Sequence, residues 1–593
     1  MPLKYNGIHK PNKLSQFMTA SNLLTLKEQI GQSKPLDFVL QSFNVFNPII
    51  AQNPDLLLSQ LNNYLKTPLT DNDVNTQTVK QTFSSTYKEF QSSQSSNTEF
   101  AASVGIEGSY GFYSGSVKAS YSSETYQAST AFSSSFNAVI NCGTVTFKRQ
   151  SDNDAIRACL TAEFCDNLDS ITTLKAAAAF VNTYGTHLVL GLNLGGFIQL
   201  KSESQTSNYK SKQEMSLAVT AAYKGAGSIS AAASATQKLS QESFSSSLEQ
   251  TVDTSGGQSN LAAQIDPKDP KTVTDWANSC TSDTSYGITS SIEIWQLAAN
   301  DTAKNTLKQY INLVILTQSI NNPTVIAAEA ALQPYVMVNV NAVANDVHLR
   351  IIGGGAMVEK NNSTFLVNSY PQIDSHGHIN GWIAGSHDIS IPASANEYLT
   401  AFAIAIYDPS YSVGNNDSLL QVQLKTASGS NPGLGGDVAA SSIDAAYLLS
   451  GGGIQSFTTG GTVKYLTGSY PSNDNTWTAT NHDYEHPASE VLLTAYAIGI
   501  KSNHASLTIT PFSVSTPESQ FEYGSQTAIL GDGISIAGGG VSVKNPTGGG
   551  NLVQQNFPPS SNSWTHYQKD LDGHVSYANC AAYAIGLTAS FDF

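Results

Sequence analysis

The chain has 593 residues, of which 29 are Lys or Arg and 45 are Asp or Glu, so its net charge is −16. An acidic chain is a poor partner for nucleic acid, which demands a basic surface. Charged residues make up only 12% of the chain, so uncharged polar residues take the place of many charged ones. Hydrophobic residues make up 40%, which does not favour disorder.

Helical patterns dominate the first part of the chain and strand patterns the last. Residues 14–66 predict short helices with apolar stripes. An Ala-rich run predicts a helix over 168–183, and a second helix is expected around 307–316, after a strand-like run at 292–295. From about residue 335 onward, strand patterns alternate with Gly, Asn and Ser turns, and no good helix is predicted.

Two segments alternate apolar and polar side chains with the period of two that is typical of strands. In the first segment, about 92–134, the apolar positions are Phe100, Ala102, Val104, Ile106, Tyr110 and Phe112, then, after a change of phase, Val117, Ala119 and Tyr121. In the second segment, about 203–245, they are Met215, Leu217, Val219, Ala221 and Tyr223, then, after a Gly-containing turn at 224–228, Ile229, Ala231 and Ala233. Every charge within these runs falls on the polar face.

Runs of about 9–11 alternating residues around a Gly turn match the pattern of a transmembrane β-hairpin. The alternative interpretation is a surface sheet with one face packed on the protein. A single hairpin cannot cross a membrane because its edge groups would lie unpaired in hydrocarbon, so insertion requires several copies that close into a barrel. Before insertion, these Ala- and Ser-rich segments are able to form short helices packed on the body.

Several simpler assignments are disfavoured. No stretch approaches the roughly 18 apolar residues of a spanning helix, and the first 30 residues lack the features of a Sec signal. We therefore expect a protein that is made in soluble form and released by lysis or by a route other than Sec. No P-loop, H-E-x-x-H or G-x-S-x-G motif is present, so we expect no enzyme, and we also expect no cofactor and no metal.

The five cysteines are few and scattered, and they contain no C-x-x-C pair. They are Cys142, Cys159, Cys165, Cys280 and Cys580. This argues against a disulfide scaffold and a Cys-based zinc site, so we expect free thiols.

Between the two alternating segments lies Tyr184-Gly185-Thr186-His187, and Gly195-Gly196 follows after Leu188 and six further residues. This spacing resembles the signature of the membrane-attack-complex/perforin (MACPF) family, which usually has Phe or Tyr in place of Leu188. The resemblance covers about residues 60–330. It implies an α+β fold with a bent antiparallel four-stranded sheet and two helical clusters, which in that family unfurl into hairpins after monomers assemble into a ring.

Three similar blocks fill the last third of the chain. Each has a Gly triplet, a Trp, and an Asp six residues after the Trp: Gly353, Trp382 and Asp388; Gly451, Trp477 and Asp483; Gly538, Trp564 and Asp570. Threefold similarity built on strands predicts an all-β pseudo-threefold domain, and a β-prism fits better than a propeller, or than a β-trefoil with its shorter repeats. The nine residues are candidates for receptor or glycan binding; the alternative is that Trp fills the core and Gly makes turns.

We therefore expect two domains, a MACPF pore-forming domain with an N-terminal helical segment over 1–333 and a β-prism-like receptor-binding domain over 334–593. The similarity to bacterial insecticidal MACPF toxins with a C-terminal β-prism implies a toxin that binds a surface receptor, assembles into a ring prepore and inserts two hairpins per subunit into the plasma membrane of an insect cell. Its partners would be further copies of itself, the lipid bilayer and an unknown receptor of protein or glycan nature. The competing hypothesis is a non-lytic, lectin-like adhesion protein.

Overall fold

The chain divides into two compact units. A computed structural model describes residues 4–5, 34–46, 58, 60–92, 132–204, 217–223, 226–242, 248–333, 336–358, 363–389, 398–413, 418–429, 437–458, 463–483, 491–521, 523–544, 550–570 and 577–593. The sheet unit consists of residues 10–311 with Phe593, and the prism unit of residues 1–9 and 312–592. The division falls within helix α13 (Asp301–Asn321). The domain boundary expected at 333 and 334 stays a prediction.

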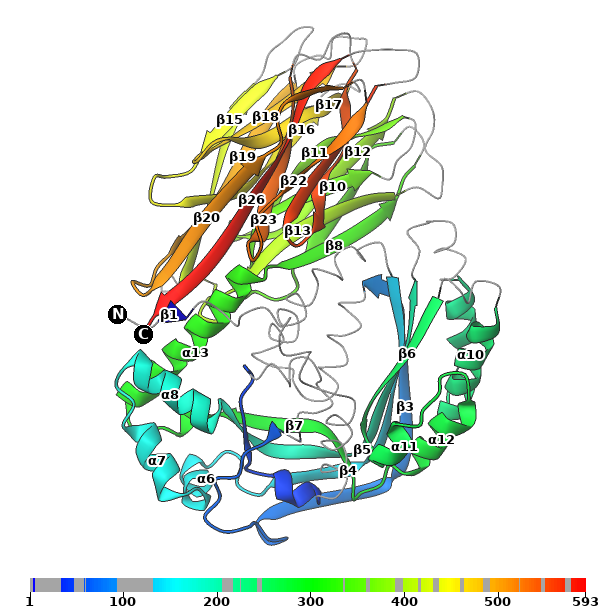
Figure 1. The fold of residues 1–593 in the computed structure, drawn as a ribbon, viewed down its shortest axis with the longest axis vertical. Coiled ribbons are helices and arrows are strands. Elements are labelled where there is room, and N and C mark those ends of the chain that lie inside the picture. The colour runs from blue at the N-terminus through cyan, green and yellow to red at the C-terminus, as the bar shows by residue number, and fades with distance from the viewer. Residues whose placement is uncertain are drawn as a thin grey trace. The chain divides into compact units, whose positions relative to one another are not determined.

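A bent antiparallel sheet forms the centre of the sheet unit. Its strands are β2 (Ser42–Phe43), β3 (Val74–Ser92), β4 (Phe132–Phe147), β5 (His187–Ser204), β6 (Leu248–Gly256) and β7 (Ser285–Glu293). The order is β2-β5-β4-β3, and both β6 and β7 also pair with β5. The first half of β5 pairs with β7 and its second half with β6. Figure 1 shows β3 running along the base of this unit and then turning upward. The predicted bent antiparallel sheet is confirmed: β3, β4 and β5 fill three long positions, β6 and β7 follow one another along β5 in the fourth, and the short β2 is an addition at the start of β5.

Helices flank this sheet in two groups. The helices are η2 (Pro35–Phe38), α6 (Asn153–Cys159), α7 (Ala162–Asp169), α8 (Leu174–Tyr184), α10 (Ile229–Gln241), α11 (Ser259–Ala262), α12 (Pro270–Asn278), η6 (Ile294–Leu297) and the first part of α13. None of the described helices is long and apolar enough to cross a membrane. The α+β class expected from the sequence is confirmed for this unit.

The helix predicted over 168–183 is divided into two helices. Helix α7 ends at Asp169, and α8 begins only at Leu174. The interruption arises because the side chain of Thr173 caps α8, accepting a hydrogen bond of 3.2 Å from the amide of Ala176. The helix predicted around 307–316 is confirmed as part of α13, and the strand-like run at 292–295 ends in η6.

The short helices predicted over 14–66 are also corrected where the structure describes this range. Residues 34–46 form η2 and the short strand β2, and residues 61–66 form turns and single bridges instead of a helix. The backbone of this segment pairs with β5, since Ser42 lies opposite Leu188 and the amide of Leu40 donates to the carbonyl of Val189 at 2.7 Å. Tertiary pairing therefore overrides the local helical pattern.

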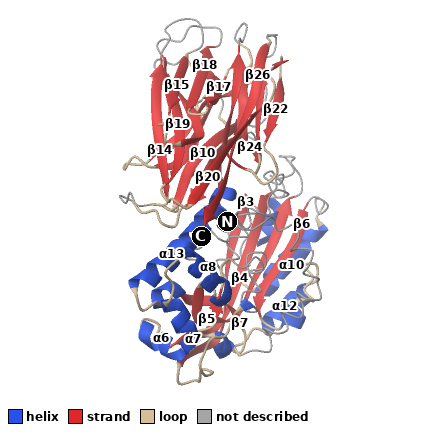
Figure 2. Cartoon of the chain, turned by 60° about the vertical axis from the view of Figure 1, so that its left-hand side comes forward, coloured by secondary structure: helices blue, strands red, loops and turns tan. Residues whose placement is uncertain are grey.

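The prism unit is built of strands throughout its described part, apart from the end of α13 (Figure 2). Its strands are β1 (Lys4–Tyr5), β8 (Thr324–Ala331), β9 (Val338–Val343), β10 (Leu349–Val358), β11 (Thr364–Ile373), β12 (Ile379–Asp388), β13 (Tyr398–Tyr407), β14 (Leu420–Gly429), β15 (Val438–Ser442), β16 (Leu448–Thr458), β17 (Lys464–Asn473), β18 (Thr476–Asp483), β19 (Val491–Ser502), β20 (Leu507–Ser515), β21 (Ser519–Phe521), β22 (Gly524–Ile529), β23 (Ser535–Lys544), β24 (Leu552–Ser560), β25 (Ser563–Lys569) and β26 (Ala578–Asp592).

These strands form three sheets around a pseudo-threefold axis. The orders are β22-β25-β24-β10-β13-β8, β14-β19-β16-β11-β12-β9 and β1-β26-β23-β17-β18-β15, with β20 and β21 also on β26. Each sheet therefore takes strands from two sequence repeats, which ties the repeats together. This is the architecture of a β-prism, and the predicted all-β pseudo-threefold domain is confirmed.

Candidate functional site

The Tyr-Gly-Thr-His motif joins helix α8 to the central strand β5. Gly185 ends α8 with a positive φ of 84°, and a Cβ at this position would lie 2.6 Å from the carbonyl oxygen of Phe43. The amide and the hydroxyl of Thr186 both donate to that oxygen, at 2.8 and 3.2 Å. In turn, the Thr186 hydroxyl accepts a hydrogen bond of 3.1 Å from the amide of Val45. The motif therefore holds the β2 segment against the start of β5.

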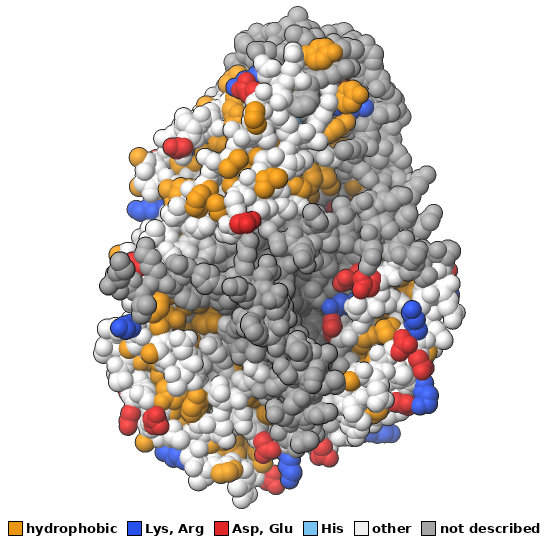
Figure 3. Space-filling model, in the orientation of Figure 1, with side chains coloured by type: hydrophobic (Ala, Val, Ile, Leu, Met, Phe, Trp, Pro, Cys, Tyr) orange, Lys and Arg blue, Asp and Glu red, His pale blue; other side chains and the backbone are white. Residues whose placement is uncertain are grey.

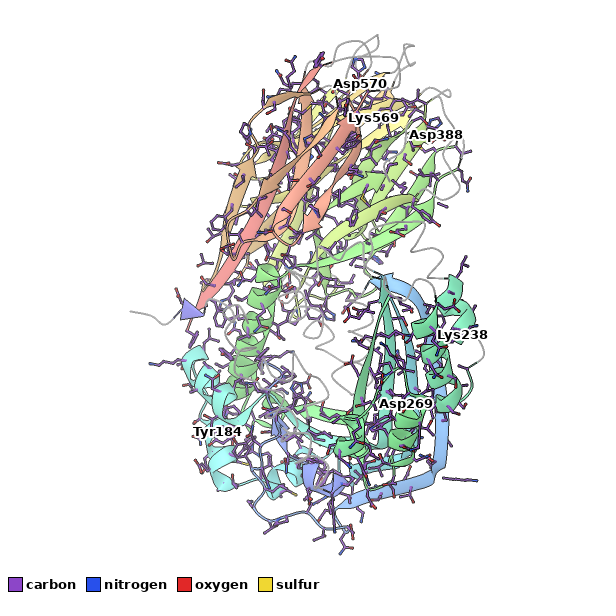
Figure 4. All side chains as sticks on the ribbon, turned by 45° about the vertical axis from the view of Figure 1, so that its right-hand side comes forward. Tyr184, Lys238, Asp269, Asp388, Lys569 and Asp570 are labelled. Atoms are coloured by element: carbon purple, nitrogen blue, oxygen red, sulfur yellow. The ribbon has the colours of Figure 1, made fainter. Side chains whose placement is uncertain are left out.

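The other motif side chains reinforce this joint. His187 is 4% exposed, its ring stacks on Phe43 at 5.2 Å, and its Nδ1 lies 2.9 Å from the Thr186 hydroxyl. Burial lowers the pKa of His187 to about 3, so the ring is neutral at physiological pH. Tyr184, labelled in Figure 4, accepts a hydrogen bond of 2.8 Å from the side chain of Asn167. These contacts give the motif a structural role.

Gly195 and Gly196 lie where β5 changes its neighbour from β7 to β6. Gly195 has a φ of 118°, and a Cβ there would overlap the carbonyl oxygen of Ile140 on β4. A Cβ on Gly196 would overlap the Sγ of Cys280. The glycine pair is therefore required both by the backbone conformation and by the close approach of neighbouring chain.

Residues 276–284, which we call the bend cover, close over this glycine pair. Trp276 is fully buried and donates from its indole nitrogen to the carbonyl of Gly256 at 3.2 Å. Thr284 exchanges hydrogen bonds of 2.8 Å with Gly195, one from the Gly195 amide and one from its own hydroxyl. The bend cover thus fixes β5 and β6 at the bend, and straightening of the sheet requires these contacts to break.

The second alternating segment is helical in its described part. Residues 217–223 are helical and are followed by α10, whose first turn is capped by Ser228. Val219 and Tyr223 are buried, whereas Leu217 is 66% exposed and Ala221 is also exposed. Burial follows the period of a helix, with residues four apart on the same side. Residues 217–223 are therefore a short helix packed on the body, as the Ala- and Ser-rich sequence permits.

The remaining predicted positions of the two segments divide as follows. In α10, Ile229 is half-buried, Ala231 is exposed and Ala233 is buried. Met215 lies outside the described residues, and so do all nine apolar positions of the first segment: Phe100, Ala102, Val104, Ile106, Tyr110, Phe112, Val117, Ala119 and Tyr121.

Tyr223 anchors the second segment on the sheet. Its ring stacks on Phe136 of β4 at 5.4 Å and on Tyr87 of β3 at 5.6 Å. Its hydroxyl lies 2.8 Å from the hydroxyl of Thr236 in α10. Burial raises the pKa of Tyr223 to about 12, so the hydroxyl stays protonated. One side chain therefore connects the helix of residues 217–223, helix α10 and two sheet strands.

The outer side of the α10 to α12 region is polar. On the face drawn in Figure 3, charged side chains gather over these helices. Lys238 of α10 and Asp269 before α12, both labelled in Figure 4, are exposed. Hence the region presents charges outward and packs its buried apolar side chains inward, as expected of helices that lie on a sheet.

The tryptophans of the three repeats fill the prism core. Trp382, Trp477 and Trp564 are fully buried, and their indole nitrogens donate to Ser369, Ser469 and Asn556 at 3.0, 3.0 and 2.7 Å. A ring enclosed in this way has no free face for a sugar. The prediction of sugar stacking is therefore replaced by the alternative interpretation, a core role.

The repeated glycines and two of the three aspartates are structural as well. The first glycines of the triplets, Gly353, Gly451 and Gly538, meet the backbone of neighbouring repeats, and a Cβ on Gly451 would lie 2.7 Å from the carbonyl of Ile352. Asp388 is 2% exposed and accepts a hydrogen bond of 2.5 Å from the Thr364 hydroxyl. Asp570 is 7% exposed and accepts a hydrogen bond of 2.6 Å from the amide of Asn551. Figure 4 places both aspartates at the same end of the prism. Asp483 ends β18, and its side chain lies outside the described part.

Sequence reasoning missed the bend cover. Trp276 lies on a short helix that begins with Pro270 after the capping side chain of Asp269. These signals predict a helix, but nothing in them indicates that its far end covers a glycine pair eighty residues earlier in the chain (276 − 196 = 80). Only the tertiary structure brings Trp276 and Cys280 to Gly196.

Comparisons with known proteins agree with this fold. Residues 56–319 match the model of the MAC/Perforin domain. These residues therefore form a MACPF domain. No curated protein matches the chain in sequence.

Three solved structures are similar to this chain at low identity and low TM-score. GNIP1Aa from Chromobacterium piscinae is 13% identical with a TM-score of 0.32, and the match covers 93% of this chain and 94% of that chain. A putative cell invasion protein with a MAC/Perforin domain from Bacteroides thetaiotaomicron is 14% identical, with a TM-score of 0.31 and coverages of 51% and 64%. The human-specific toxin intermedilysin is 10% identical, with a TM-score of 0.17 and coverages of 56% and 58%. At these scores the family assignment rests on the domain match.

Proposed function

We propose that the protein is a pore-forming toxin whose copies assemble into a ring prepore on a target membrane, where each copy inserts two β-hairpins into a shared barrel. The two alternating segments supply the hairpins. Each segment connects two strands that already pair, β3 with β4 for the first and β5 with β6 for the second. If each pair of strands is extended into the segment that connects them, a hairpin forms and the order of strands in the sheet does not change.

The register of the β5–β6 ladder is the observation that carries this proposal. The two strands pair without a bulge from Gly196 opposite Gly256 to Ser204 opposite Leu248. If β5 is extended by thirteen residues beyond Ser204 and β6 by thirteen residues before Leu248, the same register puts Leu217 opposite Ala235. The next alternate pairs are Val219 with Ala233, Ala221 with Ala231, and Tyr223 with Ile229. The strands then meet at residues 224–228, where the sequence has its Gly-containing turn.

The same residues suit a helix in water and a strand in lipid. In the helix, Val219 and Tyr223 face the sheet while Leu217 and Ala221 face solvent. In an extended strand all four would share one face, because strand side chains alternate with a period of two. That face would be apolar along both strands and would meet lipid, while Thr220, Ser230 and Ser234 would line the aqueous side.

Leu217 offers the cleanest test because it is exposed in the described structure. We expect Leu217→Lys to fold and bind cells normally but to lose dye release from liposomes, since Lys at the lipid-facing midplane of a barrel costs about 2–4 kcal/mol. Ser234→Lys, on an exposed position of α10 that would face water in the barrel, is the matched control and should release dye. Val219→Asp is a poorer test, because Val219 is fully buried.

Normal release by the Leu217 variant would refute the hairpin assignment and favour the non-lytic adhesion hypothesis. We further propose that the prism unit binds the surface receptor, and that insect cells are the target. The residues that contact the receptor would have to lie outside the eight buried positions described above, and Asp483 stays a candidate. Binding of the prism-bearing full chain to insect gut cells, against mammalian cells as a control, tests the choice of target.

A further inference from the structure

Two cysteines, Cys142 and Cys280, lie next to each other at the bend of the sheet. Cys142 lies on β4, and Cys280 lies in the bend cover, 138 residues further along the chain. The Cys142 thiol donates to the carbonyl oxygen of Cys280 at 3.4 Å. Both side chains are buried, with exposed fractions of 4% and 2%. All five cysteines are free thiols in this structure.

The local backbone places Cys142 and Cys280 next to each other. Cys142 is the extra residue of a bulge in β4, because Asn141 lies opposite Gly195 and Gly143 opposite Leu194. The Sγ of Cys280 occupies the place that a Cβ on Gly196 would need. Gly196 thus leaves room for the Cys280 side chain, and a side chain at 196 would not fit.

The surroundings keep both groups protonated while the bend cover is closed. Burial raises the pKa of Cys142 and is also the main cause of the raised pKa of Cys280, to which the neighbouring Cys142 adds a smaller rise. Thiolates attack disulfides and thiols do not, so exchange is expected only in molecules whose bend cover has transiently lifted.

We propose that Cys142 and Cys280 form a redox-sensitive staple that locks the sheet in its bent form. In the oxidising step, one of the two thiolates attacks a small disulfide and releases one small thiol. The other cysteine then attacks the mixed disulfide and releases a second small thiol. Two protein thiols lose two electrons and two protons, and one small disulfide becomes two small thiols.

The consequence follows from the elements that the bond would join. A Cys142–Cys280 disulfide ties β4 to the bend cover, which carries Trp276 and contacts Gly195. Helix α12, which leads into the bend cover, also packs on α10 of the second segment. The expected effect of this disulfide on activity rests on the proposed pore formation, because the disulfide would block activity only if the sheet has to open.

The experiment treats the full chain with oxidised glutathione and reads two quantities, the peptide map and dye release from vesicles made of insect gut-cell membrane, which carry the proposed receptor. We expect a cross-linked peptide pair containing Cys142 and Cys280, loss of dye release, and recovery of release with dithiothreitol. Cys142→Ser retains a hydroxyl that is able to donate to the Cys280 carbonyl, and it should release dye whether oxidised or not. Cys159→Ser, away from the bend in α6, should behave like the wild type.

Each outcome decides one part of the inference. Absence of the cross-linked pair after prolonged oxidation overturns the staple. Formation of the pair with unchanged dye release overturns its locking role. If the untreated wild type releases no dye, the pore proposal fails, and the cross-link together with slower hydrogen exchange over 270–284 still tests the staple by itself.

Discussion

At the scale of single residues, the structure distinguishes side chains that stabilise the fold from those that are exposed and available for binding or insertion. His187 belongs to the first class, because its neutral ring is buried and stacks on Phe43 of β2. The repeated Trp residues belong there too. The sequence showed His187 as part of a motif and the Trp residues as part of a repeat. It did not show which way each Trp points, since either face of a strand can be the buried one.

The buried His187 predicts a loss of stability in acid. Its pKa is about 3 in the folded protein and about 6.5 in the unfolded chain, so below pH 6.5 only the unfolded chain takes up the proton. The free energy of unfolding should therefore fall by about 2 kcal/mol between pH 6.5 and 5 through this residue. His187→Phe, which keeps a ring stacked on Phe43, should remove this dependence.

Chemical denaturation of both proteins at pH 7.5 and 5 measures this difference. The comparison between proteins is needed because His566 of the prism unit, with a pKa lowered to about 4 by burial, adds its own loss in acid to both. An equal fall in the wild type and the variant would show that His187 is already protonated in the folded state.

At the scale of elements, the second segment combines two periodicities in one stretch of sequence. The period of two was visible in the sequence, and Ala and Ser made a helix permissible. The buried face of that helix was not predictable, because Val219 and Tyr223 become its anchors only through contacts with Phe136 and Tyr87 from distant strands. The first segment remains a prediction from its sequence.

Weakening the Tyr223 anchor should ease the release of α10. Tyr223→Phe keeps the stacked ring but removes the hydroxyl that contacts Thr236, which costs about 1 kcal/mol. We expect faster hydrogen exchange in α10 and dye release that is about fivefold faster, since 1 kcal/mol corresponds to roughly that factor. Tyr465→Phe, a buried tyrosine of the prism unit, is the control and should leave the rate unchanged. Slower release by Tyr223→Phe would contradict the role of this contact as a restraint.

At the scale of the whole molecule, the order of its parts was predictable and their internal connections were not. The motif at Tyr184 to Gly196 indicated the bent sheet, and the three repeats indicated a pseudo-threefold domain. The sequence could not reveal that each prism sheet mixes strands of two repeats, or that residues 276–284 cover the bend. Both features depend on pairings between distant parts of the chain, which local periodicity does not encode.

The central claim is that residues 217–223 change from a helix in water to a strand with one face in lipid. A fluorophore that senses lipid, introduced as an unnatural amino acid at Leu217, Ala218, Ala221 or Ala222, tests it without altering the native cysteines. In particles assembled on liposomes, we expect a lipid signal at Leu217 and Ala221 and an aqueous signal at Ala218 and Ala222. An aqueous signal at all four positions, or a lipid signal that does not alternate between neighbours, would contradict the claim.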